Sequence, residues 1–568
     1  MDTLVRVDMD RLEAKLEPVP DGWQRLGGRA LVARFCLDEI PPTCDPLGRS
    51  NKLIFCPGLL GGTNASSSHR ISVGGKSPLT GTVKESNGGG TPGQKLARLG
   101  LKAIIVQGKP RQPGLWVLHV SQQGARLDPA DDLALLPATP AAERLRTRYG
   151  AKVAISLIGP AGERKLFASG VLHTDKEGVP WRISARGGMG AVMASKGLKA
   201  IVYDDAGTSG VPLADKQLFA AAAQRYHKLL FASPLSGKAY PEYGTAGILG
   251  AMNDLGALPT RNFSTGRFEL ADRINGETLR ELILERGGVG NPSHACMPGC
   301  TIRSSNVVPD HKGECLVSPL EYETLGMVGA NCGIGDLDQI AAINRACNEM
   351  GVDTIDVGGA LAIAMEAGVI AWGDGERCRQ VVERIASGDL LGRLIGSGGV
   401  MTAKVLGVER IPAVKGQIMS AYDPRAVKGL GVTYATSPQG ADHTCGTTAR
   451  RQMNHHSAEG QVEASRAVQV NVTIYDNTGL CMFAAPGVGE ERQVICDLLK
   501  GRYGWELTPE DLLAQARQTI LDEREFNRRA GFSEAHDKLP DWFREEENPA
   551  SGTVWDIPDA ELQLAHRF

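Results

Sequence analysis

A chain of 568 residues is too long for one hydrophobic core, so its length predicts three or four domain-sized units. Hydrophobic residues make up 42% and charged residues 22%, a balance typical of globular proteins rather than disordered or fibrous ones. The formal net charge is -3, and the charged residues form no long run of one sign. This argues against nucleic acid or a membrane surface as partner, and a small molecule is the expected ligand.

Targeting and redox signals in the sequence predict a cytoplasmic protein. Residues 1–18 alternate apolar and charged side chains and lack the apolar core of a secretory signal. The best apolar stretch, Ala360 to Trp372, is interrupted by Glu366 and is too short to span a bilayer, so it predicts a core helix. Twelve cysteines are too dilute for a disulfide scaffold, and we expect core residues, metal ligands or redox groups.

The first third of the chain reads as short β-like runs broken by glycine and proline. Lys52–Cys56 precedes Pro57-Gly58, and Ala103–Val106 precedes Gly108, which predicts a sheet-rich region. A polar linker at 204–210 then predicts a boundary near residue 205.

Helical patterns dominate the rest of the chain. One helix is predicted to end at Gly351 and a second covers Val357–Ala367. The pattern lapses near Ile411-Pro412, and the clearest helix of the last third starts at Thr508 and runs to Arg529, followed by a charged, proline-broken tail that we expect to wrap the surface. No fixed-period repeat is visible. The predicted fold is therefore α/β (α+β) with three domains, a β-rich unit at 1–205 and two mostly α-helical units at 206–410 and 411–568.

The densest chemical signal is a group of three polar segments at 66–70, 76–81 and 85–90. Small residues, glycine turns and Arg70 suit an anion such as phosphate, and Asn87 can offer a carbonyl oxygen to a hard cation such as Mg. A second segment at 181–196 places Arg186, Gly187 and Gly188 before a small-residue helix, whose N-terminus can also hold phosphate. An elaborate surface loop and a plain strand–turn–helix are the respective alternatives.

The succession of Arg70, Asn87, Arg186–Met193 and Leu198–Ile201 resembles the N-terminal domain of the tungsten- or molybdenum-pterin aldehyde:ferredoxin oxidoreductases. The resemblance implies that these segments hold a bis-pterin cofactor. It also implies that Asn87 and the Ala185 carbonyl approach an Mg ion that bridges the two pterin phosphates.

Two hexapeptides fit the same family, whose pterin-binding pattern is Asp-x-x-Gly-Leu-(Cys/Asp). The pattern is intact at Asp476–Cys481 and occurs with Asn first and Val for Leu at Asn348–Asp353. The resemblance implies one copy for each pterin, because a carboxylate or amide accepts from ring N–H groups and glycine allows close approach. The implied contacts are Asn348, Gly351, Asp353, Asp476, Gly479 and Leu480. Without the family, each hexapeptide would be an ordinary helix end.

The cysteines depart from the family pattern. Its Cys-x2-Cys-x3-Cys run and one distant cysteine bind a [4Fe–4S] cluster, and the matching residues here are Ser293, Cys296, Cys300 and Cys481. Serine thus replaces the first cysteine. Ser293, His294 or Cys315 could complete the site, or the cluster could be [3Fe–4S]; buried thiols and a structural zinc are the alternatives.

The resemblance also implies acid–base residues near the metal. Glu321, Glu323 and His443 match segments that place a glutamate and a histidine there, and we favour Glu323 over Glu321. By themselves the glutamates would be solvated charges and His443 a turn residue.

The implied reaction is oxidation of an aldehyde with water to a carboxylate, or the reverse, with electrons passing to ferredoxin or a partner subunit. A homo-oligomer or a subunit of a complex is expected. The alternatives are a non-catalytic pterin-binding or subunit-interaction relative, and a member of the family that acts on a 2-hydroxy acid or an acyl-CoA.

Overall fold

Two six-stranded sheets form the N-terminal part of the computed structural model, which describes residues 3–568. The first sheet has the order β2 (Glu13–Pro18), β1 (Thr3–Asp8), β6 (Leu101–Gln107), β3 (Leu53–Pro57), β4 (Ile71–Lys76), β5 (Val83–Gly88). The second has the order β11 (Arg182–Ser184), β10 (Val171–His173), β9 (Ala154–Leu157), β12 (Leu198–Asp204), β7 (Trp116–Ser121), β8 (Gly124–Pro129). Both predicted strands are confirmed, as β3 and β6, and each is an apolar run because both faces of the sheet are covered.

The two sheets are copies of one topology. In each, the first strand pairs antiparallel with the second and parallel with the last, and the last pairs antiparallel with the third. The sequence Gly-Leu-Lys-Ala-Ile occurs at the start of both last strands, at Gly100–Ile104 and Gly197–Ile201. The sequence shows no fixed-period repeat, and the duplication that the structure reveals is one of strand order.

Five helices accompany the sheets: α1 (Gly28–Glu39), α2 (Pro92–Arg98), α3 (Ala138–Tyr149), α4 (Pro160–Glu163) and α5 (Met189–Ser195). The remainder is helical and contains α6 (Lys216–Ala232), α7 (Tyr240–Tyr243), α8 (Leu249–Asp254), α9 (Gly276–Arg286), α10 (Tyr322–Thr324), α11 (Leu337–Met350), α12 (Thr354–Glu366), α13 (Gly375–Glu383), α14 (Leu390–Gly396), α15 (Gly399–Leu406), α16 (Lys428–Thr436), α17 (Gln461–Thr478), α18 (Ala485–Val488), α19 (Gln493–Tyr503), α20 (Pro509–Arg529), α21 (Trp542–Glu545) and α22 (Asp559–Leu562). Small sheets interrupt them, formed by β13 (Asn291–His294), β14 (Ser305–Pro309) and β15 (Cys315–Val317), and by β16 (Ala413–Val414) and β17 (Gln417–Ile418).

The predicted helices are confirmed as α11, α12 and α20. Gly351 ends α11 in a left-handed conformation, as a helix-terminating glycine does. Thr508 and Asp511 form a reciprocal capping box at the start of α20, which satisfies two backbone N–H groups that the helix leaves free.

The C-terminal tail lies largely on the surface, as expected, but large buried side chains anchor it. Phe543, Trp555 and Ile557 are fully buried and join the largest hydrophobic core, which contains α11, α12 and α16. Charged residues between these anchors account for the polar composition of the segment, because a wrapping chain can bury a few large side chains and leave the rest in water.

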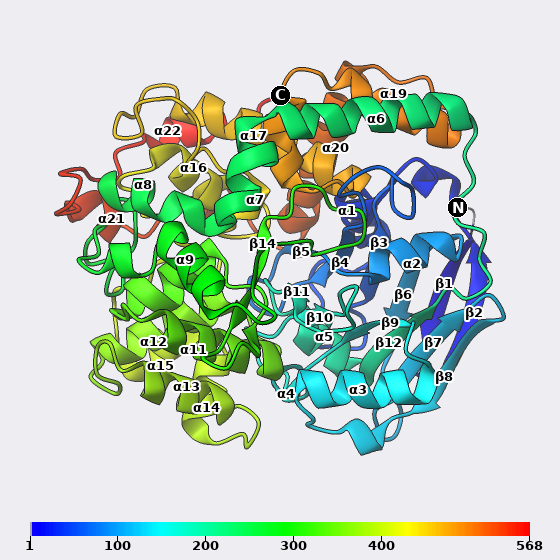
Figure 1. Cartoon of the computed structure of the whole chain (residues 1–568), viewed down its shortest axis with the longest axis horizontal. Coiled ribbons are helices and arrows are strands. Elements are labelled where there is room, and N and C mark those ends of the chain that lie inside the picture. Colours follow the sequence, from blue (N-terminus) through cyan, green and yellow to red (C-terminus); the bar gives the residue numbers. More distant parts are fainter. Residues whose placement is uncertain (1–2) are drawn as a thin grey trace.

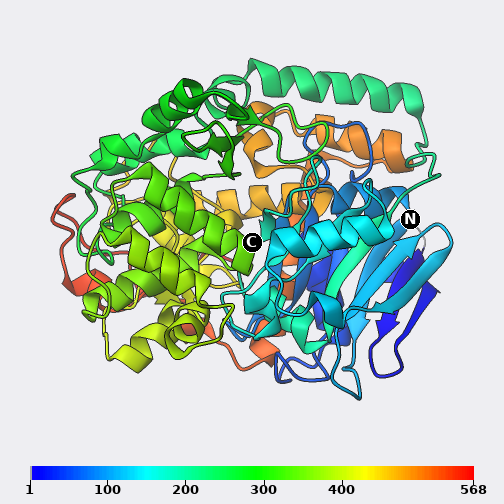
Figure 2. The same cartoon turned by 60° about the horizontal axis from the view of Figure 1, so that its bottom comes forward.

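The two sheets lie on one side of the molecule and the helices of the middle region on the other (Figures 1 and 2). Helices α6 and α19 pack together along one edge. Among the described residues, every helix is too short or too polar to cross a lipid bilayer.

Candidate active site

A cavity lies where the first sheet meets α1 and α17. Three residues that the sequence singled out, Arg70, Asn87 and Asp476, line it together. Arg70 precedes β4, Asn87 lies on β5, and Asp476 is near the end of α17. The cavity is lined by Arg29, Arg70, Glu85, Asn87, Gln439, Thr444, Cys445, Asp476 and Met482.

Arg70 and Asn87 form the polar floor of this cavity. The Arg70 Nε donates to the Asn87 side-chain oxygen, and its Nη2 lies 3.4 Å from the Asn87 carbonyl oxygen. Asn87 Nδ2 in turn donates to Glu85 Oε1 over 3.3 Å. The Asn87 amide oxygen that was expected to face a cation is therefore turned to the Arg70 guanidinium in this structure.

Arg29 lines the cavity and Glu523 is its buried partner, and sequence reasoning missed both. Arg29 is buried and donates two hydrogen bonds of 2.8 Å to Glu523, and its Nη1 lies 3.5 Å from Asp476 Oδ2. Burial raises the pKa of Asp476 to about 8, and the nearby Glu85 carboxyl adds to the rise. The sequence carries Gly28 directly before Arg29. In the structure this glycine has a φ of +49°, and a Cβ there would lie 1.9 Å from the Asp476 carbonyl oxygen.

The two hexapeptides occupy equivalent positions on the duplicated sheets. The Gly479 carbonyl accepts a 3.2 Å hydrogen bond from the Arg70 N–H, directly before β4. The Gly351 carbonyl accepts a 3.0 Å bond from the Gly170 N–H, directly before β10, the matching strand of the second sheet. Both hexapeptides therefore lie at the end of a helix and contact the start of corresponding strands. Asp353, the last residue of the first hexapeptide, also caps α12.

Gly479 should be far less tolerant of a side chain than Gly460, the glycine at the other end of α17. Both have a left-handed φ, +79° and +72°, but a Cβ at residue 479 would lie 2.9 Å from Gly58 Cα, whereas residue 460 faces open space. Gly460→Ala should cost about 1 kcal/mol of unfolding free energy from backbone strain alone. Gly479→Ala should cost ~1–3 kcal/mol more through overpacking, as measured by urea denaturation. Equal losses would contradict the close approach.

Arg186 organises a second polar cluster beside the first cavity. It lies 3.4 Å from Asp353, 3.7 Å from Asp356 and 3.9 Å from Asp442, and it donates to the Ala441 carbonyl over 2.6 Å. Gly187 and Gly188 have φ values of +84° and +75° and turn the chain from β11 into α5, while Ala185 is half-buried at the end of β11. Lys84 adds a 2.6 Å ion pair to Asp442.

Glu323 and His443 meet at the edge of this cluster. Glu323 Oε1 lies 3.2 Å from His443 Nε2, and Glu323 Oε2 accepts from the Ala421 N–H over 2.8 Å. Burial raises the pKa of the Glu323 carboxyl despite the attraction of His443. Glu321 accepts instead from the Thr245 hydroxyl, and burial raises the pKa of its carboxyl as well.

Several buried polar atoms of Arg186, of its neighbours and of Asn348 have no hydrogen-bond partner among residues 3–568. Buried polar groups are normally paired, so these atoms are free to bond a polar ligand or water. The set contains both donors and acceptors, so it suits a ligand that carries both. The atoms are Arg186 Nε, Asn348 Nδ2, Asp356 Oδ2, Gln417 Oε1 and His443 Nδ1. Glu323 Oε1 likewise accepts no hydrogen bond, although it lies 3.2 Å from His443 Nε2.

Three of the four expected cluster ligands come together. Cys296 and Cys300 share a hydrogen bond that lowers the pKa of Cys300 to about 6 and raises the pKa of Cys296. Cys481 further raises the pKa of Cys296, and Cys300 adds to the rise that burial gives the pKa of Cys481. Cys300 and Cys481 belong to the core between α6, α17 and α19. Arg70, which lines the cavity, is close enough to Cys481 to oppose the rise that burial gives the pKa of that thiol.

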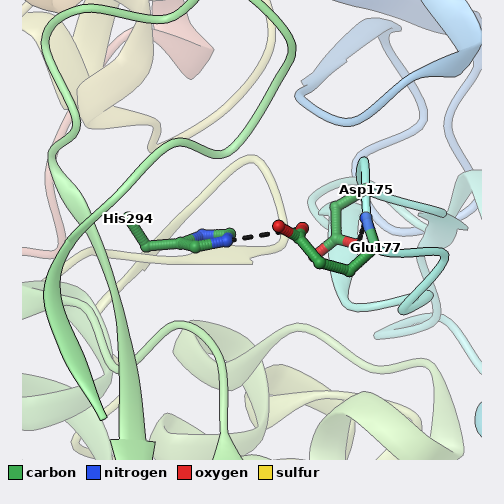
Figure 3. Close-up of side chains that lie close together, drawn as sticks. All are labelled: Asp175, Glu177 and His294. Atoms are coloured by element: carbon green, nitrogen blue, oxygen red, sulfur yellow. Dashed lines mark hydrogen bonds and ion pairs between the residues drawn. The ribbon is translucent and has the colours of Figure 1, made fainter. Parts of the chain in front are cut away.

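The three candidates for the fourth cluster ligand lie in different surroundings. His294 is turned away, since its Nδ1 is bonded to Arg182 over 3.0 Å and its Nε2 lies 3.4 Å from Glu177 (Figure 3). Cys315 is exposed, and its charged neighbours are Arg345, Asp175 and Arg182. Ser293 is half-buried on β13, where its N–H donates to Asn291 Oδ1.

Asp175, Glu177 and His294 bring their ligand atoms within 4.8 Å of one another, which is close enough to hold a metal ion (Figure 3). Asp175 Oδ1, however, already accepts from the N–H groups of Glu177 and Val179 over 3.0 Å. The Arg182 guanidinium beside His294 and Asp175 would also repel a cation. This group is an ion-pair network that joins β13 to the second large sheet.

Comparison with known proteins places the chain among oxidoreductases. Residues 4–205 match the family model "Aldehyde ferredoxin oxidoreductase, N-terminal domain", and residues 221–565 match "Aldehyde ferredoxin oxidoreductase, domains 2 & 3". The tungsten-containing aldehyde ferredoxin oxidoreductase of Pyrococcus furiosus is 33% identical and aligns with 96% of this chain and 91% of its own. The tungsten-containing aldehyde ferredoxin oxidoreductase of Thermococcus kodakarensis is also 33% identical and aligns with 97% of this chain and 93% of its own.

More distant relatives share the fold. A WOR-like subunit of an aliphatic sulfonate oxidoreductase from Pyrococcus furiosus is 26% identical over 91% of this chain and 84% of its own. The active-site complex BamBC of benzoyl coenzyme A reductase, solved with 1,5-dienoyl-CoA, matches with a TM-score of 0.82 and 18% identity over 100% of this chain and 93% of that one. Because both family models together cover almost the whole sequence, the chain belongs to the aldehyde ferredoxin oxidoreductase family, a family of oxidoreductases.

Proposed function

We propose that the chain oxidises an aldehyde with water to a carboxylate, or runs the reverse reaction, at a tungsten or molybdenum bis-pterin centre. The main support for this proposal is that the two hexapeptides occupy equivalent positions on the duplicated sheets. A cavity and a set of buried polar atoms without hydrogen-bond partners lie beside them. In this proposal residues 1–205 form the base of the site, and residues 206–410 and 411–568 each contribute one hexapeptide.

The residues that would hold the cofactor divide into two sets. Arg70, Asn87, Asp476, Gly479 and Leu480 would contact one pterin. Ala185, Arg186, Gly187, Gly188, Asn348, Gly351 and Asp353 would contact the other. Asn87 and Ala185 would also be the residues nearest to an Mg ion. When bound, such a centre would supply a two-electron acceptor for the reaction.

Glu323 and His443 would move the protons. Aldehyde and water give a carboxylate, two electrons and three protons, so a base must take a proton from the attacking water. Glu323 is suited to this role because burial keeps its pKa above that of an exposed glutamate and the Ala421 N–H fixes its second oxygen. His443, at 3.2 Å, can orient Glu323 and pass the proton onward.

Cys296, Cys300, Cys481 and Ser293 would bind an iron–sulfur cluster, either [4Fe–4S] with an altered ligand or [3Fe–4S]. Electrons would leave through it to ferredoxin or a partner subunit. Three converging thiols in a buried setting support this, and Arg70 links them to the cavity.

Ser293→Cys should move the EPR spectrum of the anaerobically purified protein toward that of an ordinary four-cysteine [4Fe–4S] cluster. The reason is that a thiolate replaces a weaker oxygen ligand at the fourth iron. Ser293→Ala serves as the matched control and should lower the iron content relative to Ser293→Cys. An unchanged spectrum and iron count in Ser293→Cys would remove Ser293 from the site.

The proposal as a whole is tested by metal analysis and a viologen-linked assay on anaerobically purified protein. We expect brown protein with tungsten or molybdenum and iron, and reduction of the dye with at least one member of an aldehyde panel. Folded, colourless, metal-free protein from cells that make the cofactor would instead identify a non-catalytic relative. Metal-loaded protein that is inactive with aldehydes but active with a 2-hydroxy acid or an acyl-CoA would correct the substrate class.

A further inference from the structure

The serine run Ser66–Ser68, which the sequence associates with an anion, lies against the cysteine site. Ser67 is fully buried, and its hydroxyl donates to Cys300 Sγ over 3.4 Å. Its carbonyl accepts a 2.8 Å hydrogen bond from the Cys481 N–H, and its own N–H donates to the Gly299 carbonyl over 3.4 Å. One residue thus contacts both cysteine-bearing segments, which are separated by about 180 positions in the sequence.

The backbone of Ser67 is held in a conformation that serine rarely adopts. Its φ is +55°, in the left-handed region that favours glycine. Such strain persists only where surrounding contacts over-determine the geometry, and it is typical of functional sites. At Ser67 the contacts that hold it are those to Gly299, Cys300 and Cys481.

The two neighbouring hydroxyls point elsewhere. Ser66 Oγ lies 2.7 Å from Thr301 Oγ1 and 3.2 Å from Ser67 Oγ, and Ser68 Oγ donates to the Ala65 carbonyl over 2.8 Å. Within the run, Ser67 therefore supplies the hydroxyl that reaches a sulfur. A backbone donor, the Arg303 N–H, reaches the same Cys300 sulfur over 3.4 Å.

We propose that Ser67 is a positioning residue of the cysteine site whose hydroxyl, by donating to the Cys300 sulfur, raises the reduction potential of the bound iron–sulfur cluster. This rests on the proposed cluster. Hydrogen bonds to cluster sulfurs stabilise the reduced state, because one-electron reduction places additional negative charge on those sulfurs. The same serine holds Cys300 and Cys481 in register through its backbone, which a substitution of the side chain alone leaves in place.

The test compares cluster potentials of the holoenzyme by EPR-monitored titration with a graded reductant. Ser67→Ala and Ser67→Gly both remove the hydroxyl, but glycine also relieves the left-handed strain. We expect both variants to shift the midpoint potential to lower values by a similar amount, with iron per chain unchanged. Ser68→Ala removes a buried hydroxyl one residue away that contacts no sulfur, and it should keep the wild-type potential.

Three outcomes overturn the inference in distinguishable ways. A potential that is unchanged in Ser67→Ala and Ser67→Gly, with full iron content, refutes the tuning role and leaves the proposed function intact. A shift in Ser67→Ala that Ser67→Gly abolishes assigns the effect to backbone strain. Wild-type protein that contains no iron refutes the proposed cluster itself, and the role of Ser67 toward it falls too. If Ser67→Ala does not fold, Ser67→Gly decides by itself.

Discussion

Glu323→Gln should lower kcat by about 10²- to 10⁴-fold, because general base catalysis is worth that much and an amide cannot accept the proton from water. The glutamine keeps the shape of the side chain and can still accept from the Ala421 N–H, so folding should be little affected. The measurement is the viologen-linked rate per bound tungsten or molybdenum, which corrects for any loss of cofactor.

The pH dependence of kcat in the wild-type enzyme gives an independent check of Glu323 as the general base. Burial raises the pKa of Glu323, so the carboxyl stays protonated to a higher pH than an exposed glutamate does. It acts as a base only above that pKa, and kcat should therefore fall as the pH falls through it. The residual activity of Glu323→Gln should lack this acidic limb.

Glu321→Gln is the matched control for this prediction. Glu321 is also buried and also has a raised pKa, but its carboxylate is bonded to Thr245, whereas Glu323 is the one that faces His443 at 3.2 Å. We expect a smaller loss of kcat for Glu321→Gln. A loss equal to or larger than that of Glu323→Gln would transfer the role of the base to Glu321.

Arg186→Gln should lower the free energy of unfolding by about 3–5 kcal/mol, the cost of leaving buried charges without their partner. Arg186 is buried among Asp353, Asp356 and Asp442, and these carboxylates would be left to Lys84 and to backbone N–H groups. The Ala441 carbonyl would lose its donor as well. Urea denaturation of cofactor-free protein measures the change without the contribution of bound metal.

Arg379→Gln provides the comparison for an exposed arginine. Arg379 also contacts two carboxylates, Glu376 and Glu383, but on the outer face of α13, where water screens them. Its loss should hardly change the denaturation midpoint. If Arg186→Gln were equally mild, the cluster around Arg186 would not depend on its charge, and the carboxylates would have to be protonated.

The sequence by itself determined those parts of the protein whose contacts are local. The capping box of α20 joins Thr508 to Asp511, and Gly351 ends α11 within its own turn, so the residues that decide these helix ends lie a few positions apart. The strands β3 and β6 could be predicted from the sequence, because a short apolar run bounded by glycine or proline favours a buried strand. The motif residues Arg70, Asn87 and Asp476 were identified by resemblance, and the structure brings them to one cavity.

Tertiary structure alone decided the partners of those residues. Arg29 meets Glu523, and Ser67 meets Cys300 and Cys481, across hundreds of positions whose proximity depends on the path of the whole chain. The duplication of the sheet could not be predicted from the sequence either, because strand order depends on which strands pair and not on composition. Burial likewise fixed the acid–base character of Glu323 and Asp476, because the cost of desolvating a carboxylate arises only when distant segments close over it.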